Sequence, residues 1–419
     1  MSKFIIQGRK PLKGEVKTSG NKNAILPLMA ATLLTKDDCV IENVPQINDV
    51  YVMGEILKEL GAKINGLGTK RLEINTSGVN KYSLNPNLVK KLRASILFLG
   101  PLLARFGRAS LTHPGGCILG RRAIGTHFEA LESLGVEINS DGEYYDARVK
   151  KIKLGKVFLD EASVTATENI LMFSALVNGE TIIEDAACEP HVSDLANFLN
   201  AMGANIKGAG TNRIIIEGSK KLAGASYRVS PDYIDVATFA ILAAATKGKI
   251  SIKEIKIEDL PMILLFLKRA GVKIETKGDS LIVLPSKLIA PRGKIQTRPW
   301  PGFPSDLMSP FIVLMTQAEG LTLCHDWMYE SRMVFVDKLI SMGAKITVCD
   351  PHRVLVYGPN KLKGRQLTSP DLRAGMALII AALCAEGESV IDNIEMVERG
   401  YEDIEGRLKT LGADIQKLA

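Results

Sequence analysis

The sequence predicts an α/β protein of two domains, each made of three copies of one strand–helix–strand–helix–strand–strand unit. Two observations predict this fold: a glycine signature that recurs six times, and a small apolar helix in each copy. The chain of 419 residues is too long for a single hydrophobic core. Its 46% hydrophobic and 24% charged residues are typical of a globular protein.

The signature is a helix-like stretch that ends in Leu, Met or Ala, followed by Gly, then Ala or Val, a polar residue and Ile. Before Gly61, for example, Val50, Met53, Ile56 and Leu60 fall on one helical face. Glycine ends a helix well because it adopts the left-handed conformation. Recurrence at so regular a period predicts internal duplication. The six glycines are Gly61, Gly135, Gly203, Gly271, Gly343 and Gly412.

Each copy also contains a second helix of small, apolar residues. These stretches are hydrophobic nearly all round, so we expect them to be buried, with the amphipathic helices outside. No long linker separates the copies, and we place the domain boundary near Gly20 and at residues 227–231. The first domain is then 21–230, and the second is 1–20 with 231–419. The predicted apolar helices are 23–34, 89–105, 165–177, 233–245, 306–318 and 371–385.

Charge and cysteine content narrow the possible functions. The net charge of +7 comes from scattered basic residues and fits an enzyme for anionic small molecules, whereas 5% aromatic residues argue against base stacking. Six widely spaced cysteines without a Cys-x-x-Cys favour a reducing cytoplasm and argue against a zinc site at Cys188 and His191. The first residues do not resemble a signal peptide, and the apolar runs are too short to span a membrane.

The segment Pro114–Arg122 carries the strongest local sign of chemistry. Two glycines precede Cys117, and Arg121 and Arg122 follow it. Glycines allow a close backbone approach to a ligand, and the two cations should lower the pKa of the Cys117 thiol. The segment predicts an acid–base or nucleophilic thiol beside an anionic substrate. A glycine-rich turn with an incidental cysteine is the alternative.

With other motifs along the whole chain, this segment resembles the UDP-N-acetylglucosamine 1-carboxyvinyltransferases, enolpyruvyl transferases that start bacterial peptidoglycan synthesis. The resemblance implies two inside-out α/β barrels of three repeats each, with the active site in the cleft between them. The matching motifs are Ser19–Ala24, Leu92–Ser95, Pro114–His127, Glu189–Pro190, Pro231–Asp232, Phe303–Asp306, Glu330–Arg332, Asp371–Arg373 and Arg399–Tyr401.

The implied reaction moves the enolpyruvyl group of phosphoenolpyruvate to the 3-hydroxyl of UDP-N-acetylglucosamine and releases phosphate. It is an addition followed by an elimination, with no cofactor or metal expected. Cys117 matches the family's acid, and Asp306 matches the residue that acts as base on the hydroxyl. On the residues alone, Asp306 is more simply explained as a helix N-cap. Lys22 and Arg399 complete the implied catalytic set.

The resemblance also implies where the substrates are held. Lys22, Arg122 and Arg399 would hold phosphoenolpyruvate, and Arg332 and Arg373 would hold its carboxylate. So many cations in one cleft would repel unless anions neutralised them, which is a physical reason to expect anionic substrates. The remaining implied substrate-binding residues are Asn23, Arg93, Ala123, Ile124, Gly125, Thr126, Ser163, Val164, Thr165, Asp306, Met328 and Asp371.

Other polar residues receive simpler interpretations. Arg93 would lie on the sugar-nucleotide side. His127 is interpreted as structural, Arg105 and Arg108 as solvated surface residues, and Asp232 as a hinge or supporting group. The five cysteines other than Cys117 are expected to be buried. Four positions depart from the family's usual residues and put the uridine and diphosphate contacts in doubt, namely Asn48, Ala123, Glu161 and Thr165.

Three rival functions remain. The 3-phosphoshikimate 1-carboxyvinyltransferases share the repeats but lack the Gly-Gly-Cys loop. A noncatalytic UDP-sugar-binding paralogue should have lost Cys117, Asp306 or Arg399, and all three are present. An RNA-end-processing enzyme with similar repeats would need a catalytic histidine and a more basic surface. We expect no nucleic-acid partner and no membrane insertion, and the oligomeric state stays open.

Overall fold

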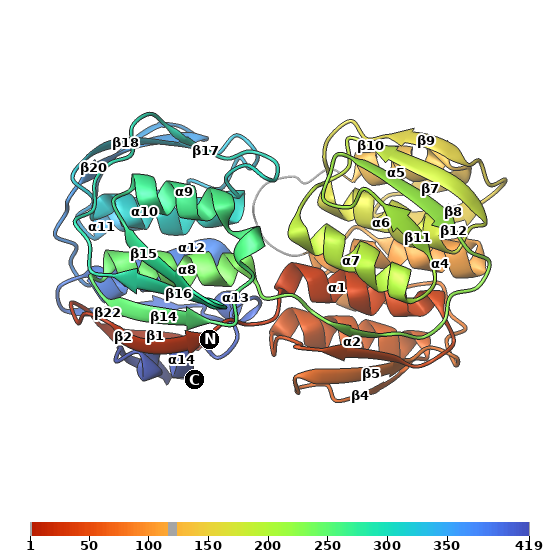
Figure 1. Cartoon of the computed structure of the whole chain (residues 1–419), viewed down its shortest axis with the longest axis horizontal. Helices are drawn as coiled ribbons and strands as arrows, with labels where there is room; N and C mark the ends of the chain where they lie inside the picture. Colours follow the sequence, from red (N-terminus) through yellow and green to blue (C-terminus); the bar gives the residue numbers. More distant parts are fainter. Residues whose placement is uncertain (1, 116–123, 419) are drawn as a thin grey trace. The chain divides into compact units, whose positions relative to one another are not determined.

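The computed structural model describes residues 2–115 and 124–418, which form two compact units (Figure 1). The split unit comprises residues 2–19 and 231–418, and the inserted unit comprises residues 20–115 and 124–230. Each unit has its own buried hydrophobic cluster, as expected of a separate domain. No helix of the described ranges is long and apolar enough to cross a membrane.

The glycine signature ends a helix in every repeat. All six glycines have a positive φ, between 80° and 112°, which confirms the predicted left-handed conformation. After α2, the Gly61 N–H bonds back to Leu57 and Lys58, and Val50, Met53, Ile56 and Leu60 are buried as predicted. The six amphipathic helices are α2 (Asn48–Leu60), α5 (Gly125–Ser133), α7 (Pro190–Ala201), α9 (Pro261–Arg269), α11 (Val336–Ser341) and α14 (Ile404–Thr410).

The apolar helices are buried, as the sequence predicts. Every residue of α8 and of α10 is buried, and in the split unit α8, α10 and α12 contact one another. The predicted stretch 89–105 is not one helix, because the chain leaves the helical conformation at Leu92, which is extended (φ −141°, ψ 119°). It is divided into α3 (Pro86–Val89), the 3₁₀ helix η2 (Arg93–Phe98) and α4 (Leu99–Phe106). The other apolar helices are α1 (Lys22–Ala31), α6 (Val164–Ala175), α8 (Tyr233–Ala245), α10 (Met308–Thr316) and α12 (Leu372–Cys384).

All the described sheets but the three-stranded one are mixed, and each repeat supplies most of the strands of one sheet. In the fifth repeat β17 pairs parallel with β18, which pairs antiparallel with β20, and β20 pairs antiparallel with the edge strand β19. Among the described residues, five sheets have four strands and one has three. In that one, a single parallel bridge between Ser83 and Ser110 stands where the first strand would be.

The strands of the inserted unit are β13 (Ser226–Arg228), β3 (Cys39–Glu42), β5 (Arg71–Asn75) and β4 (Lys63–Asn65); β9 (Gly155–Phe158), β10 (Gly179–Glu184), β12 (Arg213–Gly218) and β11 (Asn205–Lys207); and β6 (Arg108–Thr112), β8 (Tyr144–Val149) and β7 (Val136–Asp141). Those of the split unit are β2 (Lys13–Lys17), β14 (Lys249–Lys253), β16 (Ser280–Leu284) and β15 (Lys273–Lys277); β17 (Ile295–Gln296), β18 (Gly320–His325), β20 (Arg353–Gly358) and β19 (Lys345–Asp350); and β21 (Gln366–Thr368), β22 (Glu388–Asp392), β1 (Lys3–Gln7) and β23 (Asp414–Leu418).

The sixth repeat is completed by the N-terminal strand. In the other five repeats the central strand directly follows the edge strand along the chain, whereas here β1 lies between β22 and β23. Lys3 is opposite both Asp392 and Leu418, and Phe4 and Ile6 are fully buried. The last sheet of the split unit is therefore assembled from the two distant ends of the described chain.

Candidate active site

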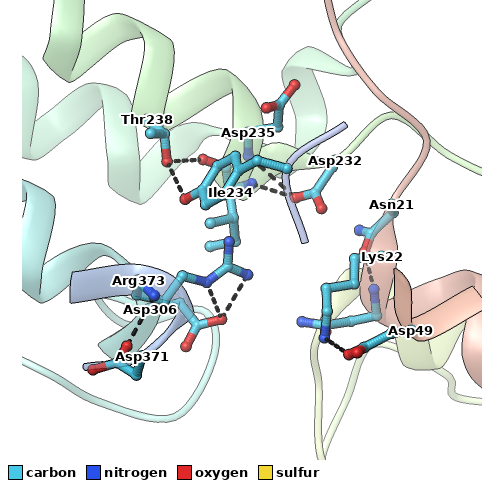
Figure 2. Close-up of polar contacts among 12 residues, drawn as sticks. Asn21, Lys22, Asp49, Asp232, Ile234, Asp235, Thr238, Asp306, Asp371 and Arg373 are labelled. Atoms are coloured by element: carbon cyan, nitrogen blue, oxygen red, sulfur yellow. Dashed lines mark hydrogen bonds and ion pairs between the residues drawn. The ribbon is translucent and has the colours of Figure 1, made fainter. Parts of the chain in front are cut away.

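In the split unit, Asp306 lies between two arginines. It belongs to the 3₁₀ turn η4 (Ser305–Leu307) that leads into α10. Its Oδ1 is 3.3 Å from Arg332 Nη2, and its Oδ2 is 3.0 Å from Arg373 Nε and 2.9 Å from Arg373 Nη2 (Figure 2 shows the pair with Arg373). No side chain caps the start of η4, so the interpretation of Asp306 as an N-cap is wrong. The Asp306 side chain is 33% exposed and can reach a ligand.

Arg373 is fixed on three sides. Its backbone N–H donates to Asp371 Oδ1 at 2.9 Å, so Asp371 is the N-cap of α12 (Figure 2). Its guanidinium lies 5.3 Å from the ring centroid of Tyr401, whose hydroxyl is bonded to Thr238. Burial lowers the pKa of Arg373 most strongly, but the Asp306 carboxylate together with Tyr401 and Asp232 outweighs burial and keeps the pKa above its ordinary value. Arg373 is therefore a firmly placed permanent cation.

Arg332 is more deeply buried, with a side-chain exposure of 0%. Its Nε is 3.6 Å from Asp326 Oδ2, and its guanidinium lies 5.1 Å from the ring centroid of Tyr329. Its Nε and Nη1 have no hydrogen-bond partner among the described residues, so two nitrogens of this buried cation remain to be satisfied. A substrate carboxylate is the kind of group that would satisfy them.

The other predicted residues of the split unit lie on adjoining segments. Met328 is half-buried, and its N–H donates to Asp326 Oδ1 at 3.0 Å. Arg399 follows α13 (Glu395–Glu398) and lies two positions before Tyr401.

In the inserted unit, Lys22 opens α1 and is held by a buried carboxylate. Lys22 Nζ lies 3.0 Å from Asp49 Oδ2, and the two side chains are 13% and 4% exposed (Figure 2). Asn21 caps the helix by accepting the backbone N–H groups of Asn23 and Ala24. A helix N-terminus with a fixed ammonium group suits a phosphate.

Two predicted nucleotide-binding segments of the inserted unit meet at one contact. Ile124 precedes α5 and Ser163 precedes α6, so Gly125, Thr126, Val164 and Thr165 all lie in first helical turns. His127 Nε2 and Thr165 Oγ1 are 2.7 Å apart and join the two helices. Arg93 opens η2 and is near enough to contribute to the lowered pKa of His127. Thr126 Oγ1 donates to Asp160 Oδ1 at 2.7 Å.

Burial, with a smaller contribution from Arg93, lowers the pKa of His127 from 6.5 to about 3. The folded state therefore excludes a proton that the unfolded state binds below pH 6.5. As the pH is lowered from about 6.5 to about 3, we expect His127 to reduce the free energy of unfolding by up to ~1.4 kcal/mol per pH unit. His127→Gln removes the titrating ring. In urea unfolding, the free energy of unfolding should decrease less between pH 7 and pH 5 in the variant than in the unmodified protein. An equal decrease in both proteins would contradict the lowered pKa of His127.

Three predicted site residues, Cys117, Arg122 and Ala123, lie outside the described residues. The chain is described up to Gly115, where an added Cβ would lie 1.8 Å from the carbonyl oxygen of Lys90. The close approach that this glycine permits is to the protein's own backbone rather than to a ligand.

Two predictions about other side chains are wrong. Arg105 is not a solvated surface residue: it donates to Leu33 O at 2.9 Å and to Thr76 Oγ1 and O at 2.7 and 2.8 Å. Burial accordingly lowers the pKa of Arg105. Cys349 is exposed rather than buried, because it lies on the edge strand β19 where the register shifts. The prediction of burial is confirmed for Cys39 and Cys324, whereas Cys188 and Cys384 are partly buried.

Sequence reasoning missed the two carboxylates that hold site cations. Asp49 lies in the first turn of an amphipathic helix, where an acidic residue is ordinarily solvated, but it is buried against Lys22. Asp326 directly follows β18, and nothing in its local sequence marks it as the partner of a site cation. These carboxylates and Asp306 neutralise cations that were predicted to need an anionic ligand. Within the described ranges, no three His, Cys, Asp or Glu side chains are arranged to hold a metal ion.

Comparisons with known proteins show the family to which the chain belongs. The family model described as EPSP synthase (3-phosphoshikimate 1-carboxyvinyltransferase) matches residues 6–408. The chain belongs to the EPSP synthase family. The region matched to the EPSP synthase family includes every predicted site residue.

Relatives within the family carry a more specific name. A UDP-N-acetylglucosamine 1-carboxyvinyltransferase of Treponema denticola is 46% identical over 99% of both chains. One of Bradyrhizobium diazoefficiens is 45% identical, covering 99% of this chain and 98% of the relative.

Solved structures of the family share the fold. The enolpyruvyl transferase NikO from Streptomyces tendae matches with a TM-score of 0.88 at 25% identity, over 99% of this chain and 98% of the other. An EPSP synthase from Acinetobacter baumannii matches over both full lengths with a TM-score of 0.76 at 20% identity, which shows the fold alone. The mixed α/β architecture is therefore that of the enolpyruvyl transferases.

Proposed function

We propose that this protein transfers the enolpyruvyl group of phosphoenolpyruvate to the 3-hydroxyl of UDP-N-acetylglucosamine and releases phosphate, the first committed step of peptidoglycan synthesis. The observation that carries the proposal is a partly exposed carboxylate, Asp306, between two buried arginines. It occurs in a chain whose full-length relatives are named for this activity.

Two acid–base groups share the chemistry. In the addition, Cys117 gives a proton to the methylene carbon of phosphoenolpyruvate, the sugar oxygen bonds to the adjacent carbon, and Asp306 takes the hydroxyl proton. In the elimination, the carbon–oxygen bond to phosphate breaks, the proton held by Asp306 leaves with the phosphate, and the Cys117 thiolate takes a proton from the new methyl group, which restores the double bond. An ionised carboxylate accepts only hydrogen bonds, so Asp306 suits the role of base.

The cations hold the phosphoenolpyruvate anions. Lys22, Arg122 and Arg399 bind its phosphate, and the helix N-terminus at Lys22 supports this assignment. Arg332 and Arg373 bind its carboxylate. The unsatisfied Nη1 of the buried Arg332 and the fixed position of Arg373 support that role, because planar guanidinium groups match carboxylates well.

The sugar nucleotide binds to residues of the inserted unit, with Asn23, Arg93, Ile124–Thr126 and Ser163–Thr165 as its contacts. Support comes from the bond between His127 and Thr165, which fixes two helix N-termini beside each other. Thr165 departs from the family's usual glycine, and its hydroxyl has a use in that bond. Met328 and Asp371 border the site from the split unit.

The finer architecture also belongs to the proposal. We infer that the three repeats of each domain form an inside-out barrel, that the domains are 21–230 and 1–20 with 231–419, and that the active site lies in the cleft between them. Three sheets and three mutually packed helices in the split unit support the barrel. The absence of Cys-x-x-Cys spacing supports a cytoplasmic location.

The phosphate released from phosphoenolpyruvate tests the function. We expect release with UDP-N-acetylglucosamine as the acceptor and none with shikimate 3-phosphate, the acceptor of the activity for which the family model is named. Turnover with shikimate 3-phosphate alone would overturn the proposal. Binding of the sugar nucleotide without turnover would favour the noncatalytic UDP-sugar-binding alternative.

A further inference from the structure

We propose that Asp326 is a positioning residue that sets the orientation of Arg332 and of Ser305, and through both of them the orientation of Asp306. The proposal rests on the proposed role of Asp306 as the base. Asp326 does not touch substrate, because its side chain is completely buried.

Asp326 is joined to four groups around the site. Its Oδ1 accepts from the backbone N–H of Met328 at 3.0 Å and from Thr297 Oγ1 at 3.2 Å. Its Oδ2 accepts from Ser305 Oγ and lies 3.6 Å from Arg332 Nε. One carboxylate thus contacts the residue before Asp306, the arginine that pairs with Asp306, and a predicted substrate contact.

The main chain holds this carboxylate in place. The Asp326 N–H donates to His352 O at 2.9 Å, and the Asp326 carbonyl oxygen lies 2.8 Å from His352 Nδ1. His352 immediately precedes β20, so the carboxylate is attached to the sheet and not to a surface loop. It is therefore a fixed point from which Arg332 and Ser305 can be aimed.

Two sets of contacts, which we call the ionic arm and the local arm, connect Asp326 to Asp306 through Arg332 and Ser305. The first is ionic: Asp326 Oδ2 lies 3.6 Å from Arg332 Nε, which is an ion pair without a hydrogen bond, and the Nη2 of the same rigid guanidinium plane faces Asp306 Oδ1 at 3.3 Å. The second is local: the Ser305 hydroxyl fixes the turn from which the Asp306 side chain projects. A buried cation placed between two carboxylates keeps its orientation better than one paired only with the partly exposed Asp306.

The discriminating variant is Asp326→Asn. The amide keeps the shape of the carboxylate and can still accept from Met328 and Thr297, but it withdraws the negative charge from Arg332. We expect kcat to fall about 10- to 100-fold with KM for UDP-N-acetylglucosamine changed less than threefold, because a misplaced base affects the transition state more than binding. Ser305→Ala removes the local arm alone and should lower kcat by a smaller factor.

A double-mutant cycle separates positioning from general damage. If Asp326 acts through Asp306, adding Asp326→Asn to Asp306→Ala should not reduce the residual turnover further. Asp235→Asn is the matched control, since Asp235 is a buried carboxylate of the same unit paired with Arg407 at 2.6 Å. It should lower the melting temperature comparably while leaving kcat within about twofold.

The outcomes are distinct. An unchanged kcat in folded Asp326→Asn, or an equal fold loss with and without Asp306, would overturn the positioning role. If Asp306→Ala itself left turnover intact, the proposal that Asp306 acts as the base would be contradicted instead. Should Asp326→Asn not fold, the cycle with Ser305→Ala and Asp306→Ala decides, and additive losses would overturn the proposal.

Discussion

Asp306→Ala is expected to lower kcat by about a thousandfold, the usual contribution of a general base, while affinity for UDP-N-acetylglucosamine stays within a few fold. The base acts mainly in the transition state, so its loss appears in turnover rather than in binding. The variant also leaves Arg332 and Arg373 without the carboxylate that they share. Affinity for phosphoenolpyruvate should therefore be retained or increased, because its carboxylate no longer competes with Asp306.

Phosphate release and calorimetric titration of each substrate would measure these effects. Asp306→Asn is the control for shape, since the amide fills the same space but cannot accept the proton, and it should lose as much turnover. A drop in sugar-nucleotide affinity as large as the drop in kcat would make Asp306 a binding residue. Turnover within tenfold of the unmodified protein would remove it from the chemistry.

Cys117 is expected to be alkylated stoichiometrically by an epoxide phosphonate of the fosfomycin type, and faster when UDP-N-acetylglucosamine is bound. The cations that hold phosphoenolpyruvate would place the epoxide against an activated thiolate. Cys117→Ser should abolish labelling, because a hydroxyl is far less acidic than a thiol. Cys117→Asp could retain turnover, since a carboxylic acid still donates a proton, yet it should escape alkylation.

The structure supplies the controls for this experiment. Burial raises the pKa of Cys324 and of Cys384 to about 12, so neither thiol should react. Cys349 is exposed and is the competing site, which makes Cys349→Ser the matched variant. It should still gain one label per chain in an intact-mass measurement. A label mapped to Cys349, or full activity in Cys117→Ala, would contradict the role of the Cys117 segment.

The elements that the sequence predicts well are those governed by local rules. The six glycines end helices because each takes the left-handed conformation itself, and the helix predicted at 233–245 has those bounds, with Asp232 capping its first turn through the N–H groups of Ile234 and Asp235. Asp371, a predicted substrate contact, follows the local rule of capping within its own helix turn. In each case the deciding partners are only a few positions away.

The failures involve partners that are remote in the chain. Capping was the simpler explanation of Asp306 because its true partners, Arg332 and Arg373, are 26 and 67 positions away. Arg105 looks solvated until the fold brings Thr76 to it, across 29 positions. Asp326 offers no signal of its own, since its importance comes from Ser305 and Arg332 arriving at one buried point. Rules of local propensity consider only neighbouring residues, so they cannot identify partners that are this far apart in the sequence.

The central place of β1 in the last sheet has a consequence for biosynthesis. Gln7 leaves the ribosome 381 residues before its partner Glu388, a delay on the order of 20–80 s at ordinary translation speeds. The inserted unit can reach its native state during that interval, whereas the first strand waits with Phe4 and Ile6 uncovered. The nascent chain therefore exposes an unpaired hydrophobic strand through most of its synthesis. This strand is a defined segment for chaperones to bind. Loop closure over so long a span also makes the split unit the slower of the two to mature.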